Sequence, residues 1–125
     1  MSFTYSFEKL EVWQLSRKLV IAIYKNSQKF PKEEQFGLTS QMRRAAVSVS
    51  SNIAEGASRM GAKEQSQFYV IAYSSLMELV SQITLTLDLE FINKEIYNSL
   101  MDQIEEVSNK LNSLRKYQFN RNLIN

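Results

Sequence analysis

The chain has 125 residues, enough for one domain with a buried core, and it contains no cysteine and no histidine. That composition excludes disulfides, thiolate metal sites, cysteine nucleophiles and histidine as a base or zinc ligand, so little catalytic chemistry remains. The net charge of +2 hides an uneven distribution, with +5 on residues 1–63, −7 on residues 64–109 and +4 on residues 110–125.

The first predicted helix covers residues 6–29. Its inward side chains recur at spacings of three and four, the pattern of one helix face. They are Leu10, Trp13, Ser16, Val20, Ile23 and Ser27. Phe30-Pro31 ends the helix, because a residue before proline is biased away from helical backbone angles.

The second predicted helix covers residues 34–55, with a start at about Glu33 or at Leu38, and Gly56 is expected in the left-handed position just past its end. Its apolar face consists of Leu38, Met42, Ala45, Val49 and Ile53. Residues 45–54 carry no charge and only small, polar-uncharged or apolar side chains. A helix without a charged face is usually buried on more than one side.

The third predicted helix covers residues 62–89, with Glu78 as its only charge between residues 65 and 87. The inward face consists of Phe68, Ala72, Ser75, Leu79, Ile83 and Leu87. A second apolar stripe consists of Tyr69, Tyr73, Met77 and Val80. This helix, like the second, therefore has apolar side chains on more than one face.

The fourth predicted helix covers residues 94–117, with Asn93 as its N-cap. Its apolar seam consists of Ile96, Leu100, Ile104, Val107, Leu111 and Leu114. Residues 1–5 and 119–125 are expected to be flexible. Because short connections force neighbouring helices to run antiparallel, residues 1–125 predict one all-α domain, an antiparallel up-down-up-down four-helix bundle.

The two middle helices predict self-association. A lone four-helix bundle cannot bury two helices on every side, so the surplus apolar surface should meet another copy of the chain. The alternative is that Ser, Gln and Tyr make these faces sufficiently polar for a monomer.

One polar row on the second helix stands out. It consists of Gln41, Arg44, Ser48, Asn52 and Glu55, at spacings of three and four. Arg44 and Glu55 are too far apart on one helix to pair directly, so each needs another partner. We interpret the row as a polar network that fixes helix register, and a binding face is the functional alternative.

Membrane insertion is not expected. The N-terminus lacks a basic region followed by an apolar run, so no signal peptide is predicted. Residues 65–87 have the length of a membrane span, but they contain polar side chains that hydrocarbon would not tolerate. We therefore expect a cytoplasmic protein.

Five basic residues are predicted to gather at one end of the bundle. They are Arg59, Lys63, Arg115, Lys116 and Arg121. In an up-down-up-down arrangement the second helix ends, the third begins and the C-terminal tail lies at that same end. The hypothesis is a nucleic-acid or partner-binding surface, with Tyr117 and Phe119 as the candidates for base stacking. The alternative is a solvated, charged end without function.

A set of motifs resembles one known family. They are residues 7–13, Phe30-Pro31, residues 37–45, Ser48, residues 52–56, Arg59, Ala72, Ser75 and Glu78. The chain thereby resembles, over about residues 7–117, the four-helix-bundle proteins encoded in intervening sequences of bacterial 23S ribosomal RNA genes. It departs from the usual pattern at Ser50-Ser51, where a proline-containing pair is common, and at Ser74, where glycine is common.

The resemblance implies a homo-oligomeric ring of five subunits, no established catalytic activity, and an association with ribosomal RNA that rests on gene location. Accessory proteins of diversity-generating retroelements look similar in fold, and they are basic rings that bind nucleic acid and a reverse transcriptase. The modest net charge of this chain weakens the carry-over of strong RNA binding.

We therefore expect a non-enzymatic assembly protein that associates with structured RNA or a nucleic-acid enzyme. No cofactor, metal or small-molecule substrate is expected. The alternative is a protein–protein adaptor without nucleic acid.

Overall fold

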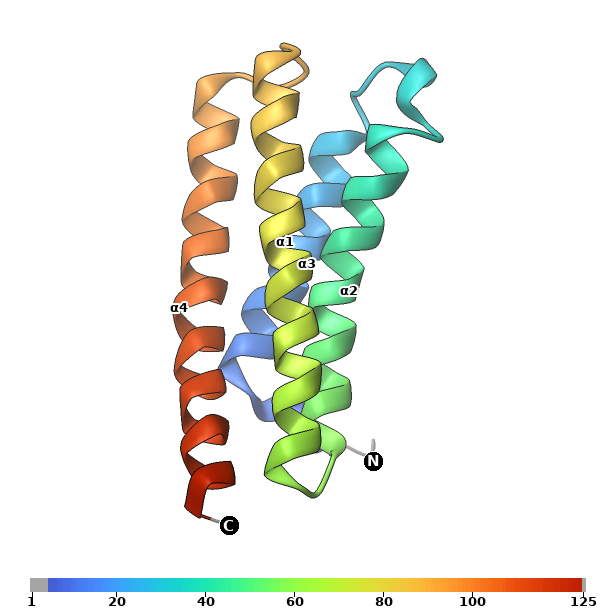
Figure 1. The fold of residues 1–125 in the computed structure, drawn as a ribbon. Coiled ribbons are helices and arrows are strands. Elements are labelled where there is room, and N and C mark those ends of the chain that lie inside the picture. The colour runs from blue at the N-terminus through green and yellow to red at the C-terminus, as the bar shows by residue number, and fades with distance from the viewer. Residues whose placement is uncertain (1–4, 125) are drawn as a thin grey trace.

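A computed structural model describes residues 5–124, which contain four long helices. The helices lie side by side (Figure 1). They are α1 (Glu11–Ser27), α2 (Leu38–Ser58), α3 (Ala62–Asp88) and α4 (Lys94–Ile124), with two short 3-10 helices, η1 (Ser6–Lys9) and η2 (Lys32–Glu34). No strand occurs within residues 5–124. Each helix runs opposite to the one before it, so the predicted all-α four-helix bundle is confirmed.

The first helix begins later than predicted. Residues 6–9 form the separate 3-10 turn η1, and Leu10 is extended (φ −75°, ψ 126°), so α1 begins at Glu11. The Phe7 ring lies edge-on to the Trp13 ring at 5.0 Å between centroids. This contact folds the turn back against the bundle, which a continuous helix from residue 6 would prevent.

The second helix begins at the later of its two predicted starts and ends later than predicted. The chain at residues 32–34 forms η2, and α2 begins only at Leu38, whose backbone N–H donates to the Glu34 carboxylate at 3.2 Å. At the other end, the prediction that Gly56 lies just past the helix in a left-handed conformation is wrong. Gly56 is buried inside α2, which continues to Ser58, and no described glycine has a positive φ.

The fourth helix is longer than predicted. Residues 119–124 continue α4 to Ile124, whereas the sequence predicted that the helix ends at residue 117. Gln118 is buried, and the Arg121 guanidinium donates to Gln65 at 3.2 Å and to Gln118 at 2.9 Å. These contacts hold the last turns against the start of α3. The expectation for residues 1–4 and 125 falls outside the described chain.

The core forms along the predicted seams. Ile23, Met42, Val49 and Ile83 lie on predicted faces and have almost no exposed surface, and Leu19, outside the predicted face of the first helix, is equally buried. Two buried hydroxyls are satisfied within their own helices: Ser16 donates to the Trp13 carbonyl at 2.7 Å and Thr86 to the Ile83 carbonyl at 2.7 Å. Helix packing therefore follows the apolar spacing in the sequence.

Most of the second apolar stripe predicted on α3 is not exposed, so it does not supply the apolar surface for self-association that the sequence predicts. Tyr69 is buried, and Tyr73 and Val80 are partly buried against the core, so most of the stripe contributes to this bundle's own packing. The exposed apolar side chains of α3 are Met77 of this stripe and, outside it, Val70, Ile71 and Leu85.

The turn between α3 and α4 has a specific helix-ending geometry. Glu90 adopts the left-handed conformation (φ 65°), the Glu90 N–H donates to the Leu87 carbonyl, and the Phe91 N–H donates to the Thr86 carbonyl. This pair of bonds is the Schellman motif, which usually has glycine at the left-handed position. Asn93 then caps α4 as predicted, because its side-chain oxygen accepts from the Ile96 N–H at 2.8 Å.

By length and composition alone, α3 could cross a membrane. Within this bundle, however, it packs along α2 on one side and α4 on the other. The central helix of a water-soluble bundle meets the same criteria.

Candidate functional site

The five basic residues predicted as a binding surface lie at the end of the bundle where α2 stops, α3 starts and α4 finishes (Figure 1). Arg59 and Lys63 lie on or beside the α2–α3 connection. Arg115, Lys116 and Arg121 lie on the last turns of α4. Because α4 remains helical to Ile124, these last three residues share one continuous helix that packs against α3.

Arg59 is held by two contacts within its own region. Its guanidinium pairs with the Glu55 carboxylate at 3.0 Å and lies over the Phe68 ring, 4.9 Å from the centroid. The carboxylate neutralises much of its charge, so Arg59 contributes less to an anion-binding surface than its position suggests. The pair also gives Glu55 the partner that the sequence requires.

Arg115 lies in a shallow groove between α3 and α4, which we call the basic groove. Its guanidinium lies over the Tyr73 ring, 4.3 Å from the centroid, and donates to the Asn112 side chain at 2.9 Å. The groove has a volume of about 310 Å³ and is lined by Ser66, Val70, Asn112, Arg115, Lys116 and Phe119. Among the described residues, no carboxylate lies within ion-pair distance of Arg115 or Lys116.

Arg121 connects the basic groove to the α2–α3 connection through Gln65. The Gln65 side chain accepts from Arg121 at 3.2 Å and donates to the Arg59 carbonyl at 2.7 Å. The positive charge of Arg121 also acts on Tyr69. Burial raises the pKa of Tyr69, and the Arg121 charge opposes that rise.

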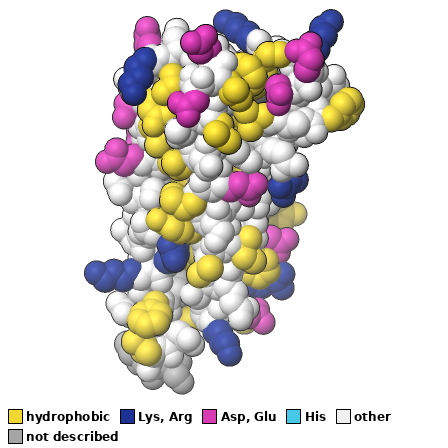
Figure 2. All heavy atoms as spheres, turned by 45° about the horizontal axis from the view of Figure 1, so that its top comes forward, with side chains coloured by type: hydrophobic (Ala, Val, Ile, Leu, Met, Phe, Trp, Pro, Cys, Tyr) yellow, Lys and Arg dark blue, Asp and Glu magenta, His cyan; other side chains and the backbone are white. Residues whose placement is uncertain are grey.

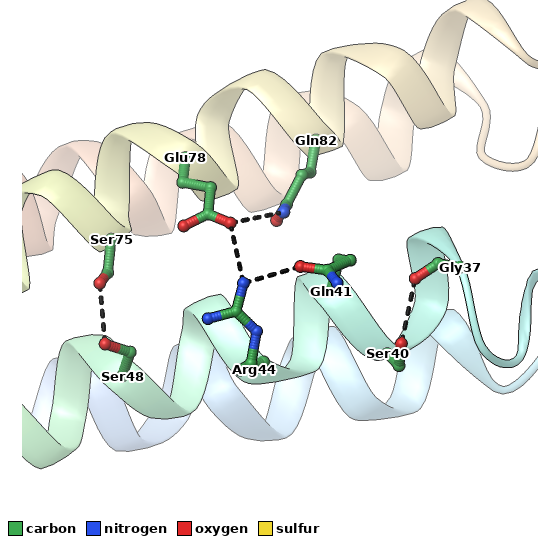
Figure 3. Close-up of polar contacts among 8 residues, drawn as sticks. All are labelled: Gly37, Ser40, Gln41, Arg44, Ser48, Ser75, Glu78 and Gln82. Carbon is green, nitrogen blue, oxygen red and sulfur yellow. Dashed lines mark hydrogen bonds and ion pairs between the residues drawn. The ribbon is translucent and has the colours of Figure 1, made fainter.

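The predicted polar row on α2 meets α3, and Figure 3 shows the contacts. Arg44 donates to Gln41 at 2.7 Å and pairs with Glu78 of α3 at 3.4 Å. Glu78 also accepts from Gln82 at 3.3 Å. Arg44 thus has its predicted partner, although the pair is substantially exposed and fixes geometry more than it stabilises.

One turn further along α2, the contact to α3 is made by small hydroxyls. Ser48 and Ser75 share a hydrogen bond at 2.8 Å, and the Asn52 amide donates to the Ser48 carbonyl and hydroxyl. Small side chains at this level let α2 and α3 approach closely. Four of the five predicted residues therefore lie along the α2–α3 seam, while Glu55 pairs with Arg59 instead.

Sequence reasoning missed a groove between α1 and α2. This α1–α2 groove has a volume of about 490 Å³ and is lined by Tyr24, Gln35, Phe36, Thr39, Ser40, Arg43, Arg44 and Val47. Phe36 is 89% exposed on the connection between η2 and α2. An aromatic residue in a polar connection, next to the Arg43-Arg44 pair, was the available signal.

A third groove lies between α3 and α4, nearer the end where those helices are connected. This acidic groove has a volume of about 330 Å³ and is lined by Met77, Val80, Met101, Asp102, Ile104, Glu105 and Ser108. Figure 2, turned toward that end, shows acidic side chains interspersed with apolar ones. No group of three or more acidic side chains within residues 5–124 is arranged to hold a metal ion.

The comparisons with known proteins point to one family. The model of the 23S rRNA-intervening sequence protein family matches residues 8–113. A solved structure from Bacteroides thetaiotaomicron, described as a protein of unknown function from the S23 ribosomal protein family, is similar with a TM-score of 0.76 and 23% sequence identity. The match covers 84% of this chain and 98% of that one, and it establishes the shared fold. No curated protein matches the chain.

Proposed function

The chain belongs to the 23S rRNA-intervening sequence protein family, and on that basis we propose that it is a non-catalytic assembly protein of the cytoplasm. In this proposal, copies of the chain form a ring-like homo-oligomer of five subunits. The ring binds structured RNA, or an enzyme that acts on nucleic acid, through its basic ends and without base specificity.

The basic groove carries the RNA part of this proposal. Arg115 and Lys116 present positive charge with no carboxylate at ion-pair distance in the described chain, and the ring of Phe119 lies exposed beside them. Guanidinium and ammonium groups contact phosphates, and an exposed aromatic ring offers a surface for an unpaired base. One such groove is a weak site, but a ring would repeat it once per subunit and add the contacts.

The assembly part rests on exposed apolar surface along α3. Val70, Ile71, Met77 and Leu85 are exposed on a helix whose only charge between residues 65 and 87 is Glu78. Burial of such side chains against a second copy is favourable by about 25 cal/mol for each Å² of apolar surface removed from water. Self-association therefore removes the exposed apolar side chains of this helix from water.

The test of RNA binding is a salt series with a structured RNA fragment, measured by filter binding. Replacing Arg115, Lys116 and Arg121 with alanine should weaken binding and flatten the plot of log affinity against log salt. Each lost phosphate contact lowers the slope by up to about 0.9. The matched control replaces Lys18 and Lys25, which are exposed on α1, and Lys29, which is exposed in the turn after it, and so removes the same charge elsewhere.

Comparing the two triple variants separates RNA binding at the basic groove from attraction by the net charge of the protein. Equal effects of the two triple substitutions would mean that net charge, and not the basic groove, attracts RNA. Negligible binding at every salt concentration would overturn the RNA role. Circular dichroism of both variants shows whether the bundle is intact, because Arg115 also packs over Tyr73.

The second candidate function is a protein–protein adaptor without nucleic acid. The observation that favours it is the acidic solvent face of α4, where Asp102, Glu105 and Glu106 are exposed without a cation at ion-pair distance in the described chain. Copurification from native lysate with and without nuclease separates the two functions. A partner that survives nuclease treatment supports the adaptor, and one lost with the RNA supports the first proposal.

A further inference from the structure

The α1–α2 groove and the acidic groove lie on opposite sides of the bundle. In the described chain, α1 packs against α2 and α4, α3 packs against the same two helices, and neither diagonal pair is in close contact. The face between α1 and α2 is therefore opposite the face between α3 and α4. A subunit can use both faces at once, one toward each of two neighbours.

The α1–α2 groove combines a fixed positive charge with exposed apolar surface. Arg43 donates to the Ser27 hydroxyl at 2.9 Å and to the Tyr24 carbonyl at 3.4 Å, and its guanidinium lies over the Tyr24 ring at 4.6 Å. No carboxylate within residues 5–124 pairs with it. Beside it, Phe36 projects from the η2–α2 connection with almost its whole side chain in solvent.

The acidic groove has the complementary character. Met77 is 37% exposed, and Met101 lies partly buried beside it. Asp102 and Glu105 line the same groove and are exposed, with no cation at ion-pair distance among the described side chains. Flexible methionine side chains adapt to an aromatic ring, and carboxylates match a guanidinium held in fixed geometry.

The two grooves also lie at the same height along the bundle. Arg44 of α2 and Glu78 of α3 pair directly across the seam at 3.4 Å (Figure 3). Arg43, one residue before Arg44, lines the α1–α2 groove, and Met77, one residue before Glu78, lines the acidic groove. A neighbouring copy can therefore bring one groove against the other without shifting along the helix axes.

We propose that the α1–α2 groove of one copy binds the acidic groove of the next, in a head-to-tail contact. Phe36 packs against the Met77 and Met101 side chains, and Arg43 pairs with Asp102 or Glu105 of the neighbour. This inference rests on the proposed self-association and adds which faces meet. A head-to-tail contact repeats from copy to copy, and it closes into a ring where the rotation between neighbours allows.

A two-fold contact between like faces is disfavoured by charge. Placing two α1–α2 grooves together would bring Arg43 of each copy toward the other, and placing two acidic grooves together would oppose carboxylates. The head-to-tail arrangement pairs opposite charges instead. A standard interface buries about 800 Å² on each partner, which is about a tenth of the 7910 Å² surface of one chain.

The test uses two variants, each altering one face. The first is Phe36→Asp with Arg43→Glu, and the second is Asp102→Lys with Glu105→Lys. Light scattering of the purified proteins should show wild type as a multimer and each variant as a monomer of 14.5 kDa. Mixing the two variants should restore association, because each retains one intact face and the two altered faces carry opposite charges.

A matched control and a single substitution test whether misfolding could explain a loss of assembly. Lys116→Glu with Phe119→Asp makes the same chemical changes in the basic groove, and it should assemble as wild type does. Phe36→Asp alone changes an exposed connection that makes little contact with the core, so its loss of assembly cannot be attributed to unfolding.

Three results would overturn the inference. If both face variants keep the wild-type mass, these two faces do not form the contact between copies, although self-association itself stands. The same result is expected if another protein fills the grooves. Assembly lost in only one face variant would indicate a two-fold contact. A monomeric wild type would reject the proposed assembly itself.

Discussion

At the residue scale, the close approach of α2 and α3 depends on Gly56. A Cβ added there would lie 2.6 Å from the Tyr69 Cε1 atom and 3.1 Å from the Phe68 Cβ atom. The Tyr69 ring is buried and cannot swing aside, so the glycine is required by packing and not by backbone conformation.

We predict that Gly56→Ala destabilises the protein although alanine favours helix. Overpacking a core costs about 1–3 kcal/mol, while the gain in helix propensity is about 0.5–1 kcal/mol. Urea unfolding should therefore give a net loss of about 1–2 kcal/mol. Gly61→Ala is the control, because a Cβ at Gly61 meets no atom within 4 Å; a stability gain in Gly56→Ala would contradict the packing argument.

Because of Tyr69, the free energy of unfolding should depend on pH in the alkaline range. Burial raises its pKa above the ordinary value of 10.0, with Arg121 opposing the rise. The unfolded chain then releases the phenol proton first, so this contribution is present below about pH 10 and is lost as pH rises toward the folded pKa.

Tyr69→Phe should remove that dependence while keeping the ring. Urea midpoints at pH 8 and pH 10.5 should fall less for the variant than for wild type. Tyr117→Phe, at an exposed position on α4, is the control and should follow wild type. Parallel curves for wild type and Tyr69→Phe would show that the buried phenol does not contribute.

At the element scale, the α3–α4 turn contains a local conflict. The Schellman bonds around Glu90 require a left-handed residue, and glutamate is a poor choice for it. The turn persists because the Phe91 ring packs against Phe30, 5.5 Å between centroids, and Ile92 is buried. Tertiary packing thus outweighs local preference here.

Glu90→Gly should raise the stability of the protein by about 0.5–1 kcal/mol, since glycine adopts the left-handed conformation without strain. The readout is the thermal midpoint, which should rise. Glu95→Gly changes the same residue type within the first turn of α4 and should lower it, because glycine weakens a helix interior. A fall for both variants would show that the Glu90 side chain has a compensating role.

At the scale of the whole molecule, the two grooves between α3 and α4 differ in charge and in position along the bundle. The basic groove and Arg121 lie toward the end where α4 finishes, while the acidic groove lies nearer the α3–α4 connection. The contact that we propose between copies therefore differs from the basic groove, although Val70 of the exposed apolar side chains on α3 lines the basic groove. Apolar contacts weaken little with salt, whereas phosphate contacts weaken strongly.

If self-association stabilises the fold, the thermal midpoint should rise with protein concentration. The measurement is a thermal-melting series over a hundredfold range of protein concentration. The two variants altered in the α1–α2 groove or in the acidic groove serve as monomeric references. We expect wild type to shift and the variants to stay constant. A concentration-independent wild type with a monomer's mass would contradict self-association.

The sequence by itself determined the helices, their order and their inner faces. Met42, Val49, Leu79 and Val107 could be placed in the core because helical spacing marks buried faces without reference to the rest of the chain. The Asn93 cap was predictable for the same reason, since a cap is a local hydrogen bond.

Only the tertiary structure decided the ends of the helices and the candidate sites. The length of α4, the helical backbone of Gly56 and the left-handed Glu90 all depend on contacts with another helix. The pairing of Arg115 with Tyr73 and the exposure of Phe36 do too. Periodicity shows which face of a helix is apolar, but the position and rotation of its neighbours decide what remains in solvent, because packing is set by residues distant in sequence.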